Sequence, residues 1–360
     1  MLIWLLLLFI FPAWELKGDK PTDLPKTVSG GDWFVKAPPG WAAGVVRTDP
    51  ESLGEAAGFT LRYMQDSKGL DPRALHPGLL SELGVTMDQV EWTLFQIAQT
   101  ARNHPEKLSS QAWWEERFNL YLWKADALPR DPPREDRLRL TKYVVYEVEG
   151  SLERTEEFDH ALWSVPKEEA HLSEHDALKK SGLLRMVLGR QDVLAGALQI
   201  EHAGAAEPLV WVTRQGLFDA MMQGTVVVRL PGGEYRWFNV HRNNGRPYVP
   251  GVADEDQDRY WFFRLVDYPL GWGWDGTHKV PLTPMVSAAG DVENLGLGKL
   301  FWLRDGNDVH LAILSDTGGA FQPNLRQLDW FVGRSESKAA FARKVKPLPS
   351  FVDAGILVIK

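Results

Sequence analysis

The C-terminal half of the chain consists of short runs of β-branched and aromatic residues separated by Gly, Pro and Asn. The pattern occurs in TVVVRLPGGEYRWFNV (225–240), RYWFFRLV (259–266), KLFWLRDGNDVHLAILSD (299–316) and AGILVIK (354–360), and it is typical of β-strands. LPGGEY and RDGNDV have the residues of hairpin turns. This half therefore predicts a β-barrel or a β-sandwich.

The N-terminal part has helical periodicity instead. Residues 80–104 carry an apolar stripe through Val90, Leu94, Ile97 and Ala98, as an amphipathic helix does. A second helix is predicted over 109–123, with Ser109 or Ser110 as the N-cap. The Pro-rich stretch ALPRDPPRED then predicts a loop, RLTKYVVYEVEGSLER (139–154) a strand, and residues 166–200 mixed loop and helix.

Composition excludes several classes of function. The net charge is -8 and the Lys and Arg residues are scattered, so no basic face for nucleic acid is expected. The chain has no Cys, which excludes disulfides, thiolate zinc sites, a cysteine nucleophile and a lipid anchor on an N-terminal Cys. Its 16 Trp can fill cores, but they can also form flat platforms on which sugar rings stack.

The first 14 residues, MLIWLLLLFIFPAW, form one apolar run. The run is short for a membrane-spanning helix, and it is interpreted as the apolar region of a signal peptide. No Lys or Arg precedes it, so an uncleaved anchor is the alternative. Both interpretations place the rest of the protein outside the cytoplasm, in the periplasm or at the cell envelope.

One metal motif is present in the sequence. HLSEH places His171 and His175 four residues apart with Glu174 between them, which matches the H-x-x-E-H pattern of one zinc-peptidase group. The surrounding residues are charged on all sides and no third ligand stands out. A solvated surface stretch is therefore favoured over a zinc site, and no metal or cofactor is expected.

A carboxylate at the end of a predicted strand is the strongest chemical signal. Asp316 follows the apolar run HLAIL and precedes Thr317, Gly318 and Gly319. Burial among apolar neighbours raises the pKa of a carboxyl, which can then donate a proton near neutral pH. The glycines are expected to leave space for a ligand and to permit unusual backbone conformations. The alternative is an aspartate that caps its own turn.

Several segments in the same order resemble the membrane-bound lytic murein transglycosylase A family. LSDTGGAFQPNLRQLDWFVG is similar to the aspartate–Gly-Gly-Ala signature of that family, which has a later aspartate in an aromatic strand. VPLTPMVSAAGDVENLGLG is similar to its V-P-L-T-P segment, and DRYWFFR to its S-Y-V-F-F segment. MMQGTVVVRLPGGEYRWFNVHRNNGRPYV and TKYVVYEVEGSLERT also have counterparts. The resemblance runs from about Pro39 to Lys360.

This resemblance implies a mainly β fold with flanking helices and two domains. A double-psi β-barrel would comprise residues 39–145 and 245–360, and a smaller β-rich domain, residues 146–244, would be inserted in it. The groove would lie between the two domains. Residues 15–38 would form a linker after the apolar segment 1–14.

The resemblance also implies an activity, namely cleavage of the β-1,4 bond between N-acetylmuramic acid and N-acetylglucosamine in peptidoglycan. The product would be a 1,6-anhydro-muramyl end, and glycan strands, with other cell-wall enzymes, would be the partners. Asp316 carries over as the catalytic acid and base, supported by Asp291 and Asp329. The residues implied to contact the glycan are Thr141, Tyr143, Gln223, Gly224, Tyr260, Thr317, Gly318 and Gly319.

The chain departs from the family pattern at proposed glycan contacts. Lys142 replaces a glycine, Val145 a glutamate and Val226 a second glycine. These departures support the alternative of a peptidoglycan-binding or cell-wall scaffold protein without activity. The retained aspartates support the enzyme.

Overall fold

The computed structural model describes residues 29–42, 44–125, 137–247, 249, 251–321 and 323–360. The apolar segment 1–14, which predicts a signal peptide or an anchor, lies outside these residues. Among the helices of the described ranges, none combines the length and the apolar character that crossing a membrane requires.

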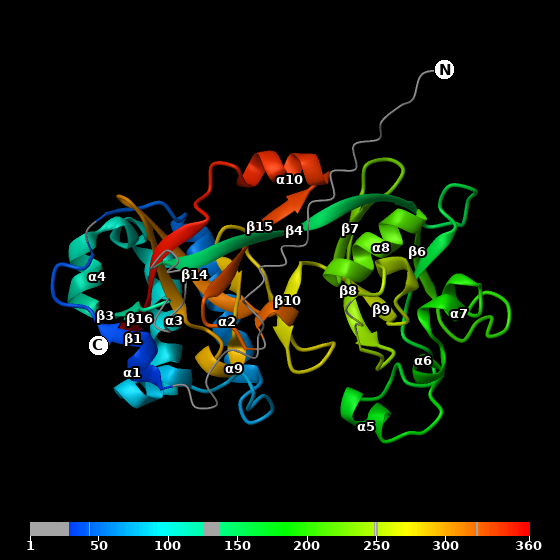
Figure 1. Cartoon of the computed structure of the whole chain (residues 1–360), viewed down its shortest axis with the longest axis horizontal. Helices are drawn as coiled ribbons and strands as arrows, with labels where there is room; N and C mark the ends of the chain where they lie inside the picture. Colours follow the sequence, from blue (N-terminus) through cyan, green and yellow to red (C-terminus); the bar gives the residue numbers. More distant parts are fainter. Residues whose placement is uncertain (1–28, 43, 126–136, 248, 250, 322) are drawn as a thin grey trace, which may run out of the picture.

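A large mixed β-sheet forms the framework of the molecule (Figure 1). Its strands follow the order β1-β3-β16-β13-β14-β12-β15-β4-β7-β8-β9, with β2 paired to β14 and with β6 joining β5 to β4. A separate hairpin is formed by β10 and β11. The strand bounds are β1 Phe34–Lys36, β2 Val45–Val46, β3 Phe118–Trp123, β4 Leu138–Ser151, β5 His160–Trp163, β6 Pro208–Val212, β7 Thr225–Arg229, β8 Tyr235–Asn243, β9 Trp261–Val266, β10 Leu270–Gly273, β11 Lys279–Pro281, β12 Ser287–Ala289, β13 Leu300–Asp305, β14 Asp308–Asp316, β15 Gln327–Ser335 and β16 Phe351–Ile359.

Short helices surround the sheet, and two long ones, α2 and α3, pack on each other beside it. The helix bounds are α1 Gly30–Trp33, α2 Pro50–Asp66, α3 Met87–Asn103, α4 Gln111–Arg117, α5 Glu174–Leu178, α6 Leu184–Val187, α7 Arg190–Leu194, α8 Arg214–Gln223, α9 Val292–Leu295 and α10 Lys338–Val345. Short 3-10 helices occur at Gly78–Leu83, Pro105–Ser109, Asp254–Asp256 and Gly319–Phe321. The sequence-based expectation of a mainly β fold with flanking helices is confirmed at this level.

Helix α3 agrees with the periodicity of its sequence. Val90, Leu94 and Ile97 are buried, and Thr86 caps the first turn in a reciprocal pair with Gln89. Helix α2 was not predicted, although its sequence contains the residues that mark the start of a helix. Asp49 accepts a hydrogen bond from the Ser52 backbone N–H as the N-cap, and Pro50 occupies the first helical position.

The helix predicted over 109–123 is wrong in its second half. Helix α4 begins after its N-cap Ser110 and ends at Arg117, and Phe118–Trp123 continue as strand β3 between β1 and β16. Four of these six residues are buried, because aromatic and leucine side chains on both faces of the strand pack into the core.

The linker predicted over 15–38 also needs correction for its last residues. Gly30–Trp33 form α1 and Phe34–Lys36 form β1, which pairs with β3. Trp33 and Phe34 are each only 1% exposed, because both rings lie in the main core. Apolar burial thus overrides the Gly-rich character of this stretch.

Two large hydrophobic cores organise the chain. The first combines residues from both ends of the sequence, from Trp33 to Leu140 and from Val280 to Val358. The second is built from residues between Ala161 and Phe263, and it includes Phe262 of β9. Figure 1 shows the blue and red ends of the chain together in one half of the molecule and the green segment in the other.

Strand β4 connects the two cores. Its first part pairs with β15 and β16, and its last residues pair with β7 and β6. Figure 1 shows β4 running from one half of the molecule to the other. A small third cluster of Val145, Val227, Leu282 and Phe331 fills the space beside this crossing strand.

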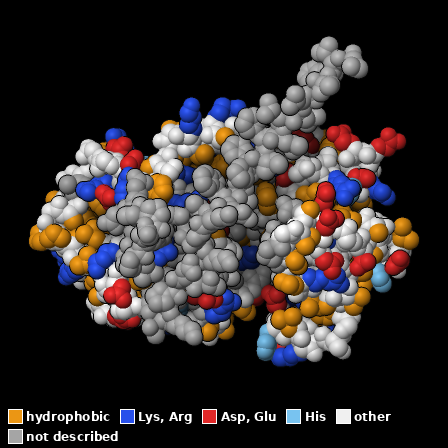
Figure 2. All heavy atoms as spheres, viewed as in Figure 1, with side chains coloured by type: hydrophobic (Ala, Val, Ile, Leu, Met, Phe, Trp, Pro, Cys, Tyr) orange, Lys and Arg blue, Asp and Glu red, His pale blue; other side chains and the backbone are white. Residues whose placement is uncertain are grey.

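Acidic and basic side chains are interspersed on the surface. Over the face seen in Figure 2, blue and red atoms alternate across the described part, and no broad area of one sign is visible there outside the grey atoms. Most ion pairs are exposed, for example Arg47 with Asp308 and Arg73 with Glu293. Exposed pairs of this kind contribute little to stability.

Candidate active site

Asp316 lies at the last position of strand β14, in the middle of the sheet. The residues before it, Leu311 to Ser315, are all buried, because β14 is covered on both faces. Asp316 itself is half-buried, and Thr317 begins the connection to the next 3-10 turn. The predicted position of this aspartate at a strand end is therefore confirmed.

Both carboxylate oxygens of Asp316 accept a hydrogen bond. The Tyr143 hydroxyl donates to Oδ2 over 2.9 Å, and the Thr317 backbone N–H donates to Oδ1 over 2.8 Å. The Thr317 hydroxyl in turn donates to the Gly290 carbonyl over 2.8 Å. These contacts fix the orientation of the carboxyl group and leave lone pairs on both oxygens for a further partner.

The candidate aspartates lie in one row across neighbouring strands. Ala289 of β12 is in register with Asp316 on one side and with Asp329 on the other, and Asp329 is in register with Thr141 of β4. Two strand spacings separate the Cα atoms of Asp316 and Asp329 by roughly 10 Å. The sheet thus brings together Asp316, Asp329, Thr141 and Tyr143, which are far apart in the sequence.

Burial shifts the protonation of both carboxyls in this row. Burial raises the pKa of Asp316 to about 6. The hydrogen bonds from Thr317 and Tyr143 and the charge of Lys279 act in the opposite direction. The pKa of Asp329 rises to about 7, first through burial and then through the charge of Asp316. Asp329 Oδ1 is buried and has no hydrogen-bond partner within the described ranges. Burial thus favours the neutral form of both carboxyls, and a buried carboxyl with a raised pKa is a candidate for acid–base chemistry.

Lys279 carries a positive charge that lowers the pKa of Asp316. Its ammonium group donates to Asn239 Oδ1 over 3.0 Å, and burial lowers the pKa of Lys279 to about 8. Asn239 is held by its own amide, which donates to Thr225 Oγ1 over 2.7 Å and to the Gly224 carbonyl over 3.3 Å. This chain of contacts links the end of helix α8 to the candidate acid.

Asp291, predicted as a supporting residue, is hydrogen-bonded to the segment that follows Asp316. It is completely buried and caps helix α9, where Oδ1 accepts from the Asn294 backbone N–H over 3.0 Å. Its Oδ2 accepts from the Asn294 side chain and from the Asn324 backbone N–H. Asp291 therefore holds the segment that follows Asp316 against the start of α9, while burial raises its own pKa.

Other predicted contact residues lie apart from the carboxylate row. Gln223 accepts a hydrogen bond from the Tyr146 backbone N–H, and Gly224 ends helix α8 in the left-handed region. A Cβ atom at Gly224 would lie 2.8 Å from the Trp261 ring, so glycine is required there. Tyr260 is fully buried in the second core against Phe262. Their function in glycan binding stays a prediction.

The two glycines after Asp316 lie in open surroundings. Neither Gly318 nor Gly319 has a positive φ, so neither adopts the left-handed conformation that glycine permits. A Cβ atom at Gly319 would meet nothing within 4 Å, and one at Gly318 would meet only the Phe321 ring, at 3.9 Å. The space in front of these residues is therefore open, and its use by a ligand stays a prediction.

The sequence analysis missed Gly271 of β10. A Cβ atom there would lie 2.6 Å from the Ser315 carbonyl oxygen and 3.0 Å from Asp316 Cβ. The hairpin β10–β11 therefore packs directly on the candidate acid and also supplies Lys279. The segment GWGWDG has the signal of a close backbone approach, but the sequence does not say against what.

The residues that depart from the family pattern are mostly buried. Val226 lies in the second core and Val145 in the third cluster. The Lys142 ammonium donates to the carbonyls of Leu140 and Pro349. The structure thus gives each of these side chains a packing or backbone partner within the protein.

The H-x-x-E-H motif does not form one helical face. Helix α5 begins at Glu174 with Ser173 as its N-cap, so His171 precedes the helix and only His175 lies in it. Both imidazoles are exposed. Across the described ranges no group of three His, Cys, Asp or Glu side chains is placed to hold a metal ion.

No protein-family model and no curated protein sequence matches the chain. Solved structures do match its fold. A membrane-bound lytic murein transglycosylase from Agrobacterium tumefaciens superimposes with a TM-score of 0.60 at 16% identity, over 92% of this chain and 96% of that one. MltA from Escherichia coli with bound chitohexaose gives 0.56 at 15% identity, over 94% and 97%. MltA from Neisseria gonorrhoeae gives 0.55 at 17% identity, over 95% and 97%. The resemblance drawn from the motifs is therefore confirmed at the level of the fold.

Proposed function

We propose that this protein is a lytic transglycosylase, which cleaves the β-1,4 bond between N-acetylmuramic acid and N-acetylglucosamine in peptidoglycan with formation of a 1,6-anhydro end. The observation that carries the proposal is the Asp316 carboxyl, which is half-buried at a strand end and has its pKa raised to about 6. It occurs in a fold shared with solved lytic transglycosylases.

The reaction needs only one catalytic carboxyl. Protonated Asp316 would donate its proton to the glycosidic oxygen as the bond to C1 of the muramyl residue breaks. The resulting carboxylate would then take the proton from the C6 hydroxyl of the same sugar, whose oxygen bonds to C1. Ordinary glycosidases need a second carboxylate to activate water or to act as the nucleophile. Here the substrate supplies its own nucleophile, which fits the single carboxyl at the end of β14.

The neighbours of Asp316 support both steps. The Tyr143 hydroxyl and the Thr317 N–H stabilise the carboxylate that remains after the first proton transfer. Burial also raises the pKa of Asp329, to about 7, which favours its neutral form and reduces the negative charge beside the reacting sugar. Asp291 holds the backbone that follows the catalytic residue.

The finer architecture belongs to the same proposal. The two ends of the chain would form a double-psi β-barrel, with the inserted domain beside it and the glycan groove between them. Because Phe262 and Phe263 pack in the second core, we place the C-terminal border of the inserted domain after β9 rather than at residue 244. The glycan would contact Thr141, Gln223, Gly224, Thr317 and the open face of Gly318 and Gly319. Tyr260 would support this surface from within the second core.

The proposed substrate implies an exported protein. Peptidoglycan glycan strands would be the partner, and any membrane contact would be made through residues 1–14. A non-catalytic peptidoglycan-binding protein is the second candidate, because Lys142, Val145 and Val226 depart from the family pattern near the proposed groove.

The test is mass spectrometry of purified peptidoglycan sacculi after incubation with protein that begins at Lys17. Wild type is expected to release fragments with 1,6-anhydro-muramyl ends, and Asp316→Asn to lose at least about a thousandfold in rate, because the amide cannot transfer the proton. The circular dichroism spectrum and melting temperature should show that the variant is folded.

The other outcomes separate the candidates. Reducing ends in place of anhydro ends would mean that water is the nucleophile, and substantial activity of Asp316→Asn would exclude Asp316 as the acid. Absence of products while the protein still sediments with the sacculi would favour the binding protein.

A further inference from the structure

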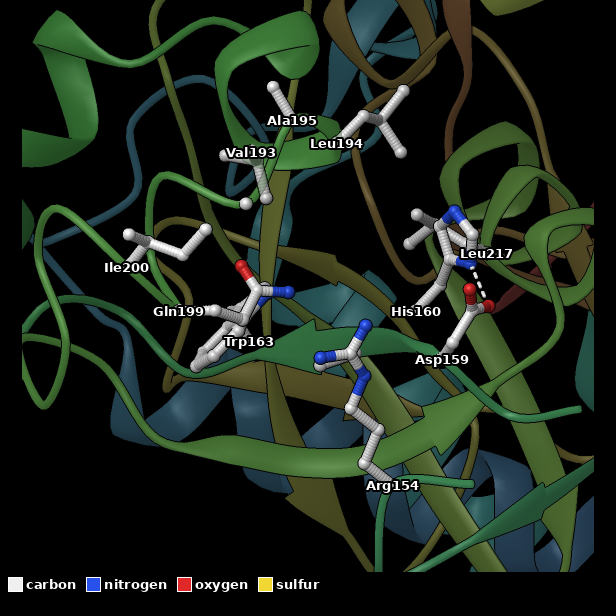
Figure 3. Close-up of a pocket in the computed structure, with 12 residues that line it drawn as sticks. Arg154, Asp159, His160, Trp163, Val193, Leu194, Ala195, Gln199, Ile200 and Leu217 are labelled. Atoms are coloured by element: carbon white, nitrogen blue, oxygen red, sulfur yellow. Dashed lines mark hydrogen bonds and ion pairs between the residues drawn. The ribbon is translucent and has the colours of Figure 1, made fainter. Parts of the chain in front are cut away.

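A pocket of about 180 Å³ lies beside the second core, between strand β5 and helices α7 and α8 (Figure 3). None of the residues assigned to the proposed reaction lines it. Its lining includes Arg154, Asp159, His160, Trp163, Gln199 and Leu217.

The lining is divided into an apolar and a polar part. Trp163, Val193 and Leu217 contribute buried apolar side chains to the lining. Figure 3 shows Arg154 extending toward the space between Gln199 and His160, across from Val193, Leu194 and Ala195. A few polar groups that converge over an apolar wall are the usual composition of a small-molecule site.

Arg154 lacks a carboxylate partner among the described residues. Its guanidinium lies over the Trp211 ring, 5.6 Å from the ring centroid, which fixes the side chain without neutralising its charge. The neighbouring Asp159 pairs with His160 instead, over 2.5 Å between Oδ1 and Nδ1. The planar fork of Arg154 is therefore available to an external carboxylate.

Gln199 adds a second unsatisfied group. Its Oε1 is buried at the pocket wall and accepts no hydrogen bond from the described residues. Buried acceptors in proteins nearly always have a donor, so an unpaired one at a cavity indicates a missing N–H or O–H partner.

We propose that this pocket binds the carboxylate end of a short peptide whose last residue is small and apolar. The terminal carboxylate would pair with Arg154, and an N–H of the peptide would donate to Gln199 Oε1. The small side chain would pack on Trp163, Val193 and Leu217. A volume of about 180 Å³ accommodates such a terminus but is below the roughly 300 Å³ at which pockets for larger ligands begin.

The same chemistry can come from two sources. Peptides of the cell wall end in D-configured residues, whereas the C-terminus of a protein ends in an L-residue. The inference stands independently of the activity proposed for Asp316, so the binding assay uses the Asp316→Asn protein, in which the pocket is unchanged and glycan cleavage is absent under the proposed function.

The experiment is isothermal titration calorimetry with N-acetyl-D-Ala-D-Ala, N-acetyl-L-Ala-L-Ala and the C-terminal amide of each. At least one of the two acids is expected to bind, and its amide at least about tenfold more weakly, because the amide cannot form the charged pair with Arg154. Arg154→Gln should lose about tenfold or more in affinity for the acid, while Arg343→Gln, an exposed arginine on α10, should bind as the parent protein does.

Preference for the D-peptide would assign the pocket to the wall peptides, and preference for the L-peptide to a protein terminus. The proposal is overturned if neither acid binds at about 10 mM, if acid and amide bind equally, or if Arg154→Gln binds like Arg343→Gln. Because Arg154 is exposed, its replacement is expected to leave folding intact, which a matched melting temperature will verify.

Discussion

At the scale of single residues, opposing effects set the pKa of Asp316. Burial raises it, and the Thr317 N–H, the Tyr143 hydroxyl and the charge of Lys279 lower it. The result, about 6, lets the carboxyl give up its proton and take it back near neutral pH. Since Asp316 must be protonated before the first step, the proposed reaction should slow as the pH rises through this value.

Replacing Lys279 by Gln removes the positive charge that favours the ionised form of Asp316. The pKa of Asp316 should rise, and the alkaline fall in the rate of glycan cleavage should move to higher pH. Lys279→Arg keeps the charge and serves as the control. The other charged groups that act on residue 279 are Arg264, Glu174 and Asp275, and they are the same in both variants. A pH–rate profile of Lys279→Gln that coincides with wild type would contradict this account.

Gly271 is the second residue on which the acid depends. In Gly271→Ala the new Cβ atom would collide with Ser315 O and Leu282 Cδ2, at 2.6 Å each. We expect a loss of about 1–3 kcal/mol in the free energy of unfolding, as for overpacked cores, and a lower rate of cleavage because Asp316 is displaced.

The control is Gly319→Ala, whose Cβ atom would meet nothing within 4 Å. Its free energy of unfolding in urea should stay within about 0.5 kcal/mol of wild type. Equal stability of the two variants would mean that β10 can move away from β14 at little cost.

At the scale of elements, buried ionic contacts hold the short helix α6 in place. Glu169 is completely buried and accepts hydrogen bonds from Arg185 Nε on α6, over 2.9 Å, and from Arg242 Nη1 on β8, over 3.0 Å. Helix α6 has only four residues and cannot be stable alone. The position of α6 against β8 therefore depends on this cluster.

Glu169→Gln leaves two buried guanidinium groups without a neutralising charge. The variant should lose about 3–5 kcal/mol in the free energy of unfolding, measured in urea. Glu207→Gln is the matched control, because Glu207 is exposed and its oxygen lies 3.7 Å from Lys167, so little change is expected. A loss below about 1 kcal/mol for Glu169→Gln would show that the cluster does not hold α6.

At the scale of the whole molecule, the main core closes only when the two ends of the chain meet. Strand β16, from the C-terminus, pairs with β3, β13 and β4. Lys299 lies in this core, 1% exposed, and its ammonium donates to the His76 and Gly296 carbonyls, each over 3.3 Å. Burial lowers the pKa of Lys299 to about 7.

This buried lysine makes stability depend on pH. The unfolded chain holds the Lys299 proton up to about pH 10.4, whereas the folded protein releases it near pH 7, so the unfolded state binds more protons between these values. The Lys299 contribution to the free energy of unfolding should therefore rise by roughly 2 kcal/mol from pH 7 to pH 9. Lys299→Met should lack this rise, which urea unfolding of both proteins at several pH values will test; parallel curves would contradict it.

The sequence by itself determined the elements with strong local signals. The hairpins at LPGGEY and RDGNDV, the apolar stripe of α3 and the strand that ends at Asp316 all follow from periodicity and turn residues. The order of motifs also predicted the fold that the solved transglycosylases share. Local patterns suffice in these cases because hydrogen bonding and burial within a few residues decide the conformation.

Only the tertiary structure decided which residues meet. Strand β3 looked helical because its partners β1 and β16 lie far away in the sequence, and burial against them outweighs local propensity. The row of Asp316, Ala289, Asp329 and Thr141 is created by strand register, which no single segment encodes. Lys279 and Gly271 lie near Asp316 because β10 and β11 fold over β14. The pocket at Arg154 exists because helices α7 and α8 lie beside β5. Long-range pairing fixes these contacts, so the raised pKa of Asp316 is a property of the assembled sheet rather than of its sequence neighbours.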